Sequence, residues 1–115
     1  MEELKMDDFI NLYDDVDWQN TPGSTYAEGT EQKVLRDENS AKTILLKLPG
    51  GFYMPSHTHV TTEQHFVLTG EYISEGKIYQ PGSYQIIKAH ENHGPFESKD
   101  GALILVIWDA FKSVE

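Results

Sequence analysis

Eleven residues of the chain, PSHTHVTTEQH (55–65), concentrate side chains that can bind a metal ion. They include His57, His59, Glu63 and His65, whereas the whole chain has five histidines. Because side chains alternate across a strand, His57 and His59 are expected to present two imidazoles on one face. Glu63 follows across the turn-like VTT, and its carboxylate faces the same point if the next strand pairs back on the first. The segment fits either one half of a metal site or a polar strand and turn that is rich in histidine.

Imidazole and carboxylate ligands together suit iron, nickel, zinc, copper or manganese. Two histidines and one carboxylate also form the facial triad of non-haem Fe(II) enzymes. A further ligand is available from KAHENHGPF, where His90 and His93 follow another predicted strand. The ligand types therefore fit a transition-metal site with these two segments as its halves, and a histidine-rich polar strand and turn stays the alternative interpretation.

The elements that must position these residues read as short β-strands separated by Gly, Pro, Asn or Asp. Turn signals recur roughly every 8–12 residues, which is typical of a sandwich or barrel. SEGK predicts a tight hairpin in which Gly76 takes a positive φ. No segment after residue 20 keeps a helical period. The sequence predicts one all-β domain, with strands within 32–37, 42–48, 52–59, 63–74, 77–80, 82–89 and 102–111.

The charge and the cysteine content of the chain exclude or disfavour several classes of protein. The formal charge of the 115-residue chain is −10, and seven acidic residues lie among the first 17. This balance repels phosphate backbones and disfavours nucleic acid as a partner. There is no cysteine, so thiolate chemistry and cysteine-ligated metals are excluded. We expect an acidic N-terminal arm over 1–25 and a single domain over 26–115, in a cytoplasmic protein with no signal peptide and no membrane span.

The stretch GFYMPSHTHVTTEQHFVLTG (51–70) reads G-x5-H-x-H-x3-E-x6-G. It resembles the first conserved motif of the cupins, with every key position filled. The second cupin motif can be laid on the segment that starts at Gly82, and its metal-binding histidine is then His93. This second motif is degenerate, because three of its usual residues are replaced by Lys88, His90 and Glu97. The resemblance covers about residues 40 to 110.

The resemblance implies a small antiparallel β-barrel of the jelly-roll type, with an irregular acidic arm before it. It implies His57, His59, Glu63 and His93 as ligands of one divalent transition metal inside the barrel. Fe²⁺ is favoured, and Zn²⁺, Ni²⁺ and Mn²⁺ also suit the donors. A homodimer is expected as well, because cupins commonly pair through their sheets and an exposed edge strand needs cover.

Two sets of cupins are most similar to the run from Leu45 to Tyr84. The first set, dioxygenases that cleave acetylacetone or dihydroxyacetophenones, implies a metal-dependent oxidoreductase acting on a small diketone or hydroxyketone. Glu63 would then be a catalytic ligand that can leave the metal to make room, or take a proton. The second set, the cupin domains of zinc-binding anti-sigma factors, implies a non-catalytic zinc-binding sensor. Metal-dependent isomerase or lyase chemistry is a further alternative on this fold.

Other residues are candidates for the walls of a substrate pocket. Phe52, Tyr84 and Phe96 lie in or beside the motif strands and are expected to line it. His65 shares strand parity with Glu63, so it is a core histidine, a substrate contact or a competing ligand. His90 is either a surface histidine at the barrel mouth or a proton donor. Since Arg36 is the only arginine, a neutral or weakly anionic small molecule is the favoured substrate.

Overall fold

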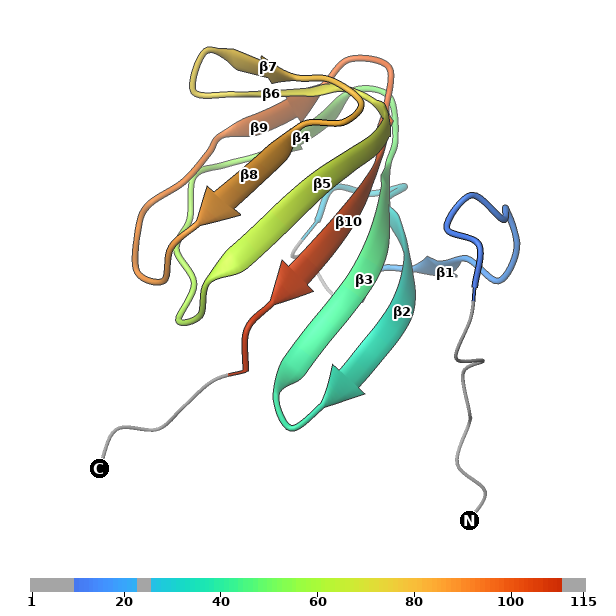
Figure 1. Ribbon diagram of the computed structural model, residues 1–115. Helices are drawn as coiled ribbons and strands as arrows, with labels where there is room; N and C mark the ends of the chain where they lie inside the picture. Colours follow the sequence, from blue (N-terminus) through green and yellow to red (C-terminus); the bar gives the residue numbers. More distant parts are fainter. Residues whose placement is uncertain (1–9, 23–25, 111–115) are drawn as a thin grey trace.

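The alternating segments of the sequence form ten β-strands in a computed structural model, which describes residues 10–22 and 26–110 (Figure 1). No residue in these two ranges is helical, as the sequence predicts. The strands are β1 (Gln19–Asn20), β2 (Glu31–Glu38), β3 (Ala41–Leu48), β4 (Phe52–Met54), β5 (Glu63–Gly70), β6 (Tyr72–Ser74), β7 (Lys77–Tyr79), β8 (Tyr84–Ile87), β9 (Phe96–Ser98) and β10 (Ala102–Trp108). Across the described chain, no helix is long and apolar enough to cross a membrane.

The strands form two antiparallel sheets. A six-stranded sheet has the order β1-β2-β3-β10-β5-β8, and a four-stranded sheet has the order β4-β9-β6-β7. Figure 1 shows the long strands β2, β3, β10 and β5 side by side, with the short strands β4, β6, β7 and β9 beyond one end of the longer sheet. All the pairings between strands are antiparallel, so the predicted all-β antiparallel fold is confirmed.

The hydrophobic core lies between the two sheets. Alternation along β3 and β10 turns every second residue inward, and the burial pattern of β10 follows this period. Strands of both sheets contribute to the core, which contains Ile44, Leu46, Leu48, Phe52, Val67, Tyr72, Ile87, Phe96, Ala102, Ile104 and Val106. At one end of this core, side chains of β5 and β10 and the three loop histidines His57, His59 and His93 form the site described below.

Most strands lie where the sequence predicts them, and the differences are local. The SEGK hairpin joins β6 and β7, with positive φ at Glu75 (51°) and Gly76 (80°). Strand β9 falls in a segment for which the sequence predicted no strand, since Gly94 and Pro95 precede it and only three residues follow before the next turn. The predicted strands 52–59 and 82–89 are shorter, because each runs into a loop that carries histidines.

The acidic arm packs against the six-stranded sheet. Residues 1–9 and 23–25 of the predicted arm, and 111–115 of the predicted domain, lie outside the described residues. Within residues 10–22, Trp18 places its ring under two ammonium groups, with the Nζ of Lys33 4.8 Å and that of Lys47 5.1 Å from the ring centroid. Lys33 is only 6% exposed and donates to the backbone oxygen of Asp14 over 3.0 Å. The arm therefore accepts a hydrogen bond from Lys33 and covers this side chain on the outer face of the six-stranded sheet.

Replacing Trp18 by alanine should destabilise the domain by about 1–3 kcal/mol. The variant loses two cation–π contacts of about 0.5–1 kcal/mol each and uncovers the stem of the buried Lys33. The free energy of unfolding measured by urea denaturation tests this. Tyr13, which is 61% exposed, provides the matched aromatic control, and Tyr13→Ala should change the free energy by less than about 0.5 kcal/mol. Equal stabilities of the two variants would mean that the contacts of the Trp18 ring add nothing to the stability of the fold.

Candidate metal site

Two histidines far apart in the sequence are joined by their backbones. His57 and His93 exchange both backbone hydrogen bonds, each over 2.9 Å, and form an isolated antiparallel bridge. This pairing brings the two imidazole rings to a centroid distance of 4.3 Å. The segment that follows β4 and the segment that precedes β9 therefore meet at these histidines, because β4 and β9 are themselves paired.

His59 completes a cluster of three imidazoles. Its ring lies 4.7 Å from that of His57 and 5.4 Å from that of His93, measured between centroids. Its backbone oxygen accepts a hydrogen bond of 2.8 Å from the amide of His90, which holds the second loop alongside the first. Among the described residues, one ligand nitrogen from each of the three histidines can be chosen so that all lie within 4.8 Å of one another. Such a cluster can hold one metal ion.

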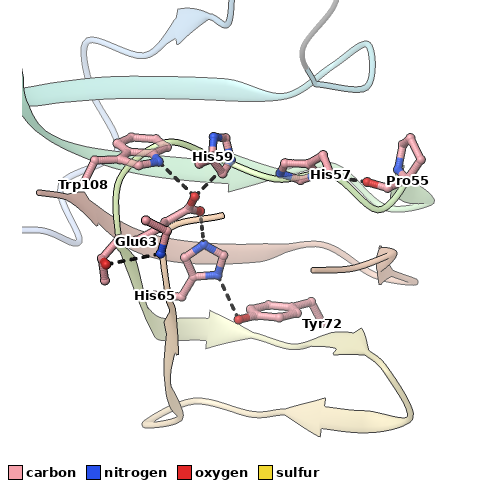
Figure 2. A network of polar contacts seen from close by, with 9 residues as sticks. Pro55, His57, His59, Glu63, His65, Tyr72 and Trp108 are labelled. Atoms are coloured by element: carbon pink, nitrogen blue, oxygen red, sulfur yellow. Dashed lines mark hydrogen bonds and ion pairs between the residues drawn. The ribbon is translucent and has the colours of Figure 1, made fainter. Parts of the chain in front are cut away.

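The chemistry of the cluster fits a divalent transition metal. His93 is 3% exposed, yet neither of its ring nitrogens has a hydrogen-bond partner. A buried polar atom without a partner is costly, and a metal ion would satisfy one of these nitrogens. The Nδ1 of His57 donates to the backbone oxygen of Pro55 over 2.9 Å, which leaves Nε2 with its lone pair free (Figure 2).

The protonation of these rings also suits a metal. Burial lowers the pKa of His93 to about 4, against the opposing effect of the Glu63 charge. Burial likewise lowers the pKa of His59. Both imidazoles are therefore neutral at pH 7, which is the form that coordinates a metal.

Glu63 starts β5 beside this cluster and is 5% exposed. Its Oε1 lies 3.1 Å from the Nε2 of His59 and accepts a hydrogen bond of 2.9 Å from the Nε1 of Trp108 (Figure 2). A separation of 3.1 Å is close to that of two ligands sharing one ion, when each lies roughly 2.0–2.2 Å from it. Burial acts to raise the pKa of Glu63, but the hydrogen bond and charge of His65 outweigh it and hold the pKa below its usual value. The carboxylate is ionised and beside the cluster.

A chain of hydrogen bonds orients Glu63 from the side away from His59. The Nε2 of His65 contacts Oε2 of Glu63, and its Nδ1 lies 3.0 Å from the hydroxyl oxygen of Tyr72 (Figure 2). That hydroxyl donates to Oε1 of Gln85 over 2.9 Å, so its oxygen is available to accept from His65. His65 is thus buried and inward-facing, and it positions the carboxylate of Glu63.

The space next to the histidines is small. A cavity of about 30 Å³ is lined by the three histidines, Glu63 and His65, with apolar walls that include Phe52 and Phe96. This volume holds about one or two water molecules. It therefore has room for an ion and a small further ligand, but not for an organic molecule several atoms long.

The other predicted pocket residues lie elsewhere. Tyr84 of β8 is 47% exposed and faces outward, where its hydroxyl donates to Oε1 of Gln64 over 2.7 Å. His90 is exposed, with a positive φ of 69°. This conformation explains why glycine is usual at that position of the cupin motif. Of the five predicted wall residues, the structure thus brings Phe52, His65 and Phe96 to the cavity.

Sequence reasoning assigned no site role to three residues that contribute to it. Trp108 is the hydrogen-bond donor to Glu63, Tyr72 is the partner of His65, and Tyr26 lines the cavity. Trp108 and Glu63 are 45 residues apart in the chain. Residue spacing within one segment could not have predicted this contact. Only the antiparallel register of β10 with β5, in which the two residues are direct partners, could have done so.

Two facing antiparallel sheets with a cluster of histidines in the cavity between them define a cupin. A family model described as the ChrR cupin-like domain matches residues 6–112, and the chain belongs to this family. The resemblance to the cupins is therefore confirmed. None of the curated proteins matches the chain in a sequence comparison.

Solved structures agree with the fold. A candidate acetylacetone dioxygenase from Methylibium petroleiphilum PM1 has a TM-score of 0.73 and 21% identity, with 94% of this chain and 81% of that chain covered. An acetylacetone dioxygenase from Acinetobacter johnsonii has a TM-score of 0.70 and 17% identity, with 94% and 80% covered. At these identities the likeness concerns the fold alone.

A third structure has a higher identity. It is that of Rhodobacter sphaeroides SigE in complex with the anti-sigma ChrR, and the matched chain has a TM-score of 0.68 and 28% identity. The match covers 84% of this chain and 51% of the other, so this chain spans about half the length of that relative.

Proposed function

We propose that the chain binds one divalent transition metal, Fe²⁺ by preference, through His57, His59, His93 and Glu63. We further propose that it is a dioxygenase-like enzyme acting on a small diketone or hydroxyketone. The observation that carries the proposal is the buried ring of His93, whose two nitrogens have no hydrogen-bond partner although two other imidazoles lie beside it. Such a ring is costly to bury unless a metal ion completes its interactions.

The residues around the cluster have distinct roles in this proposal. A bound Fe²⁺ would supply Lewis acidity and redox chemistry with O2. His57, His59 and His93 hold the ion, and Glu63 is a ligand that can also take a proton from the substrate at its Oε1 or Oε2. His65 and Trp108 keep this carboxylate in place by contacting one oxygen each. Phe52 and Phe96 exclude water from the reaction.

The dioxygenase class is supported by the fold shared with two structures named as acetylacetone dioxygenases, one of them a candidate, over 94% of this chain. It is supported further by the donor set of three imidazoles and one carboxylate, which suits iron. The choice of a diketone or hydroxyketone as substrate is part of the proposal, since the likeness to these two structures, at 21% and 17% identity, concerns the fold.

Oxygen uptake by the iron-loaded protein tests this function. With acetylacetone and with a dihydroxyacetophenone as substrates, we expect O2 consumption that requires both the substrate and Fe²⁺. The same protein loaded with Zn²⁺ should consume none, because zinc has no redox chemistry. Absence of uptake with every diketone and hydroxyketone tried, from protein that contains one iron per chain, would reject the proposed reaction.

A zinc-binding sensor is the second candidate. Two observations favour it: the family model is that of the ChrR cupin-like domain, and the cavity of about 30 Å³ leaves little room for a substrate beside the ion. A closed four-ligand zinc site would stabilise the domain without turnover. The matched structure contains a sigma factor, SigE, so a protein partner would be expected for this chain too. Stoichiometric zinc in the purified protein, together with no O2 uptake when iron-loaded, would favour this candidate over the enzyme.

Several expectations from the sequence stay predictions. These are isomerase or lyase chemistry as a further alternative, the homodimer, the cytoplasmic location, and the boundary between arm and domain after residue 25.

A further inference from the structure

A second hollow opens beside the metal cavity. It measures about 250 Å³ and is lined by Tyr26, Gln32, Lys42, Ile44, His59 and Trp108, among others. We call it the side hollow. Tyr26 and His59 line both the side hollow and the metal cavity, so the two spaces adjoin. Because the metal cavity is too small for an organic substrate, the body of any substrate that reaches the cluster must occupy neighbouring space.

The register of the six-stranded sheet places Lys42 in the same row of paired residues as Trp108 and Glu63. Trp108 of β10 is paired directly with Lys42 of β3 on one side and with Glu63 of β5 on the other. Directly opposed residues of antiparallel strands project to the same face. Lys42 therefore projects to the inner face, two strands from Glu63, at a Cα distance of roughly 10 Å given a strand spacing of about 4.8 Å.

The ammonium group of Lys42 lacks a partner among the described residues. The two lysines that contact Trp18 have acceptors, Asp14 for Lys33 and Asp15 and Glu31 for Lys47. Lys42 forms no hydrogen bond or ion pair within residues 10–22 and 26–110, although Asp37 is its cross-strand neighbour on β2. Lys42 is thus an inward-projecting cation without an ion pair at the wall of a hollow, in a chain of net charge −10. An anionic ligand would supply the ion-pair partner that the ammonium group of Lys42 lacks.

The remaining walls indicate the shape of such a ligand. Trp108, Tyr26 and Ile44 offer aromatic and aliphatic surface, and Gln32 adds an amide. A volume of about 250 Å³ lies just below the roughly 300–1,000 Å³ of pockets that hold drug-sized ligands. The side hollow therefore suits a one-ring or short-chain molecule, with a single anionic group.

We infer that the side hollow binds a small organic monoanion, with its apolar body against Trp108 and Tyr26 and its carboxylate or enolate paired with Lys42. The other end of the ligand then lies at His59, next to the metal cavity. This inference extends the proposed function, and it rests on that function for the claim that the ligand is the substrate. It makes Lys42 the residue that selects a charged over an uncharged substrate. The expected substrate is a keto acid or an ionised dicarbonyl rather than a neutral ketone.

Binding of a charged and an uncharged probe of the same shape tests the inference without turnover. The zinc-loaded protein is titrated with benzoate and with benzamide, and the two indole N–H resonances are followed by ¹H–¹⁵N NMR. The resonance of Trp108 should shift on binding, and that of Trp18 in the arm should not. Benzoate should bind at least about tenfold more tightly than benzamide, as expected for a hydrogen bond to a charged group.

Variants of Lys42 decide which group recognises the charge. Lys42→Met should weaken benzoate binding about tenfold and leave benzamide binding unchanged, and Lys42→Arg should keep the preference. Lys77→Met, at an exposed lysine of β7 in the other sheet, is the matched control and should bind both probes as the unmodified protein does. Equal binding of the two probes by the unmodified protein, no shift of Trp108, or an unchanged preference in Lys42→Met would each overturn the inference.

The inference and the proposed function fail separately. If Lys42→Met loses the preference for benzoate and the iron-loaded protein consumes no O2, the anion site is supported and the dioxygenase is rejected. If the unmodified protein and Lys42→Met consume O2 equally with diketones and neither prefers benzoate, the enzyme is supported and the anion site is rejected.

Discussion

The double variant His57→Ala, His93→Ala is expected to lose its bound metal. The purified protein should contain about one divalent transition metal per chain, and the variant less than about a tenth of that. Removing a residue that merely supports a ligand already costs about 10–100-fold in metal affinity, so removing two ligands must cost more. Elemental analysis of protein purified without chelator or affinity metal measures this directly, and the identity of the metal separates the two candidate functions.

The same loss should be visible in stability. A ligand present at about 100 times its Kd stabilises the folded state by about 2.7 kcal/mol, which raises the Tm of a domain of this size by roughly 10 °C. Chelator should therefore lower the Tm of the unmodified protein and leave that of the double variant unchanged. His90→Asn is the matched control, because it removes an exposed imidazole of the same loop and asparagine tolerates the positive φ of 69°. A double variant that keeps its metal would place the binding site elsewhere in the chain.

Gly70→Ala should be the most destabilising single methyl addition at a described glycine. Gly70 ends β5 with φ +70°, and a Cβ there would lie 2.3 Å from the backbone oxygen of Gly101 and 2.7 Å from the Cα of Ala102. Both contacts are with backbone, that of the first residue of β10 and that of the residue before it, and backbone cannot rotate away as a side chain can. We expect a loss of about 4 kcal/mol or more in the free energy of unfolding, a large part of the stability of a typical domain.

The control for this variant is Gly51→Ala. Gly51 has a similar φ of +81°, but a Cβ there would meet nothing within 4 Å. It should cost only the penalty of the left-handed conformation, about 1–2 kcal/mol. Urea denaturation of both variants isolates the steric contribution of the close approach between β5 and β10. If the two variants are equally stable, the strands separate at this point at little cost and the clash is not real.

Parts of the candidate site could be predicted from the sequence because they depend on local periodicity. Their spacing of two residues predicted that the imidazoles of His57 and His59 lie together. The rings are 4.7 Å apart between centroids, although both lie in the loop after β4 and not in the predicted strand. The alternation of side chains along one strand turns His65 inward with Glu63, which their hydrogen-bonded contact bears out. The role of Glu63 as a metal ligand stays a prediction, which the structure supports with a distance of 3.1 Å to His59.

Parity along one strand does not decide which face of a strand is buried when both faces carry large apolar residues. In β8 the sequence YQII offers Tyr84 and Ile86 on one face and Gln85 and Ile87 on the other. Tyr84 was expected to line the pocket because it lies in a motif strand. The structure buries Ile87 instead and leaves Tyr84 on the outer sheet surface, since β8 is an edge strand whose pairing with β5 sets its orientation.

The sequence by itself determined the class of the fold, the motif that joins His57, His59 and Glu63, and the candidacy of His93. Only the tertiary structure decided that the backbones of His57 and His93 pair, that Trp108 holds Glu63 from 45 residues away, and that Lys42 projects to the same face. The physical reason is that strand register and the size of a cavity depend on contacts between distant segments. Residue spacing within one segment carries the periodicity of a strand, but it does not specify which other strand lies beside it.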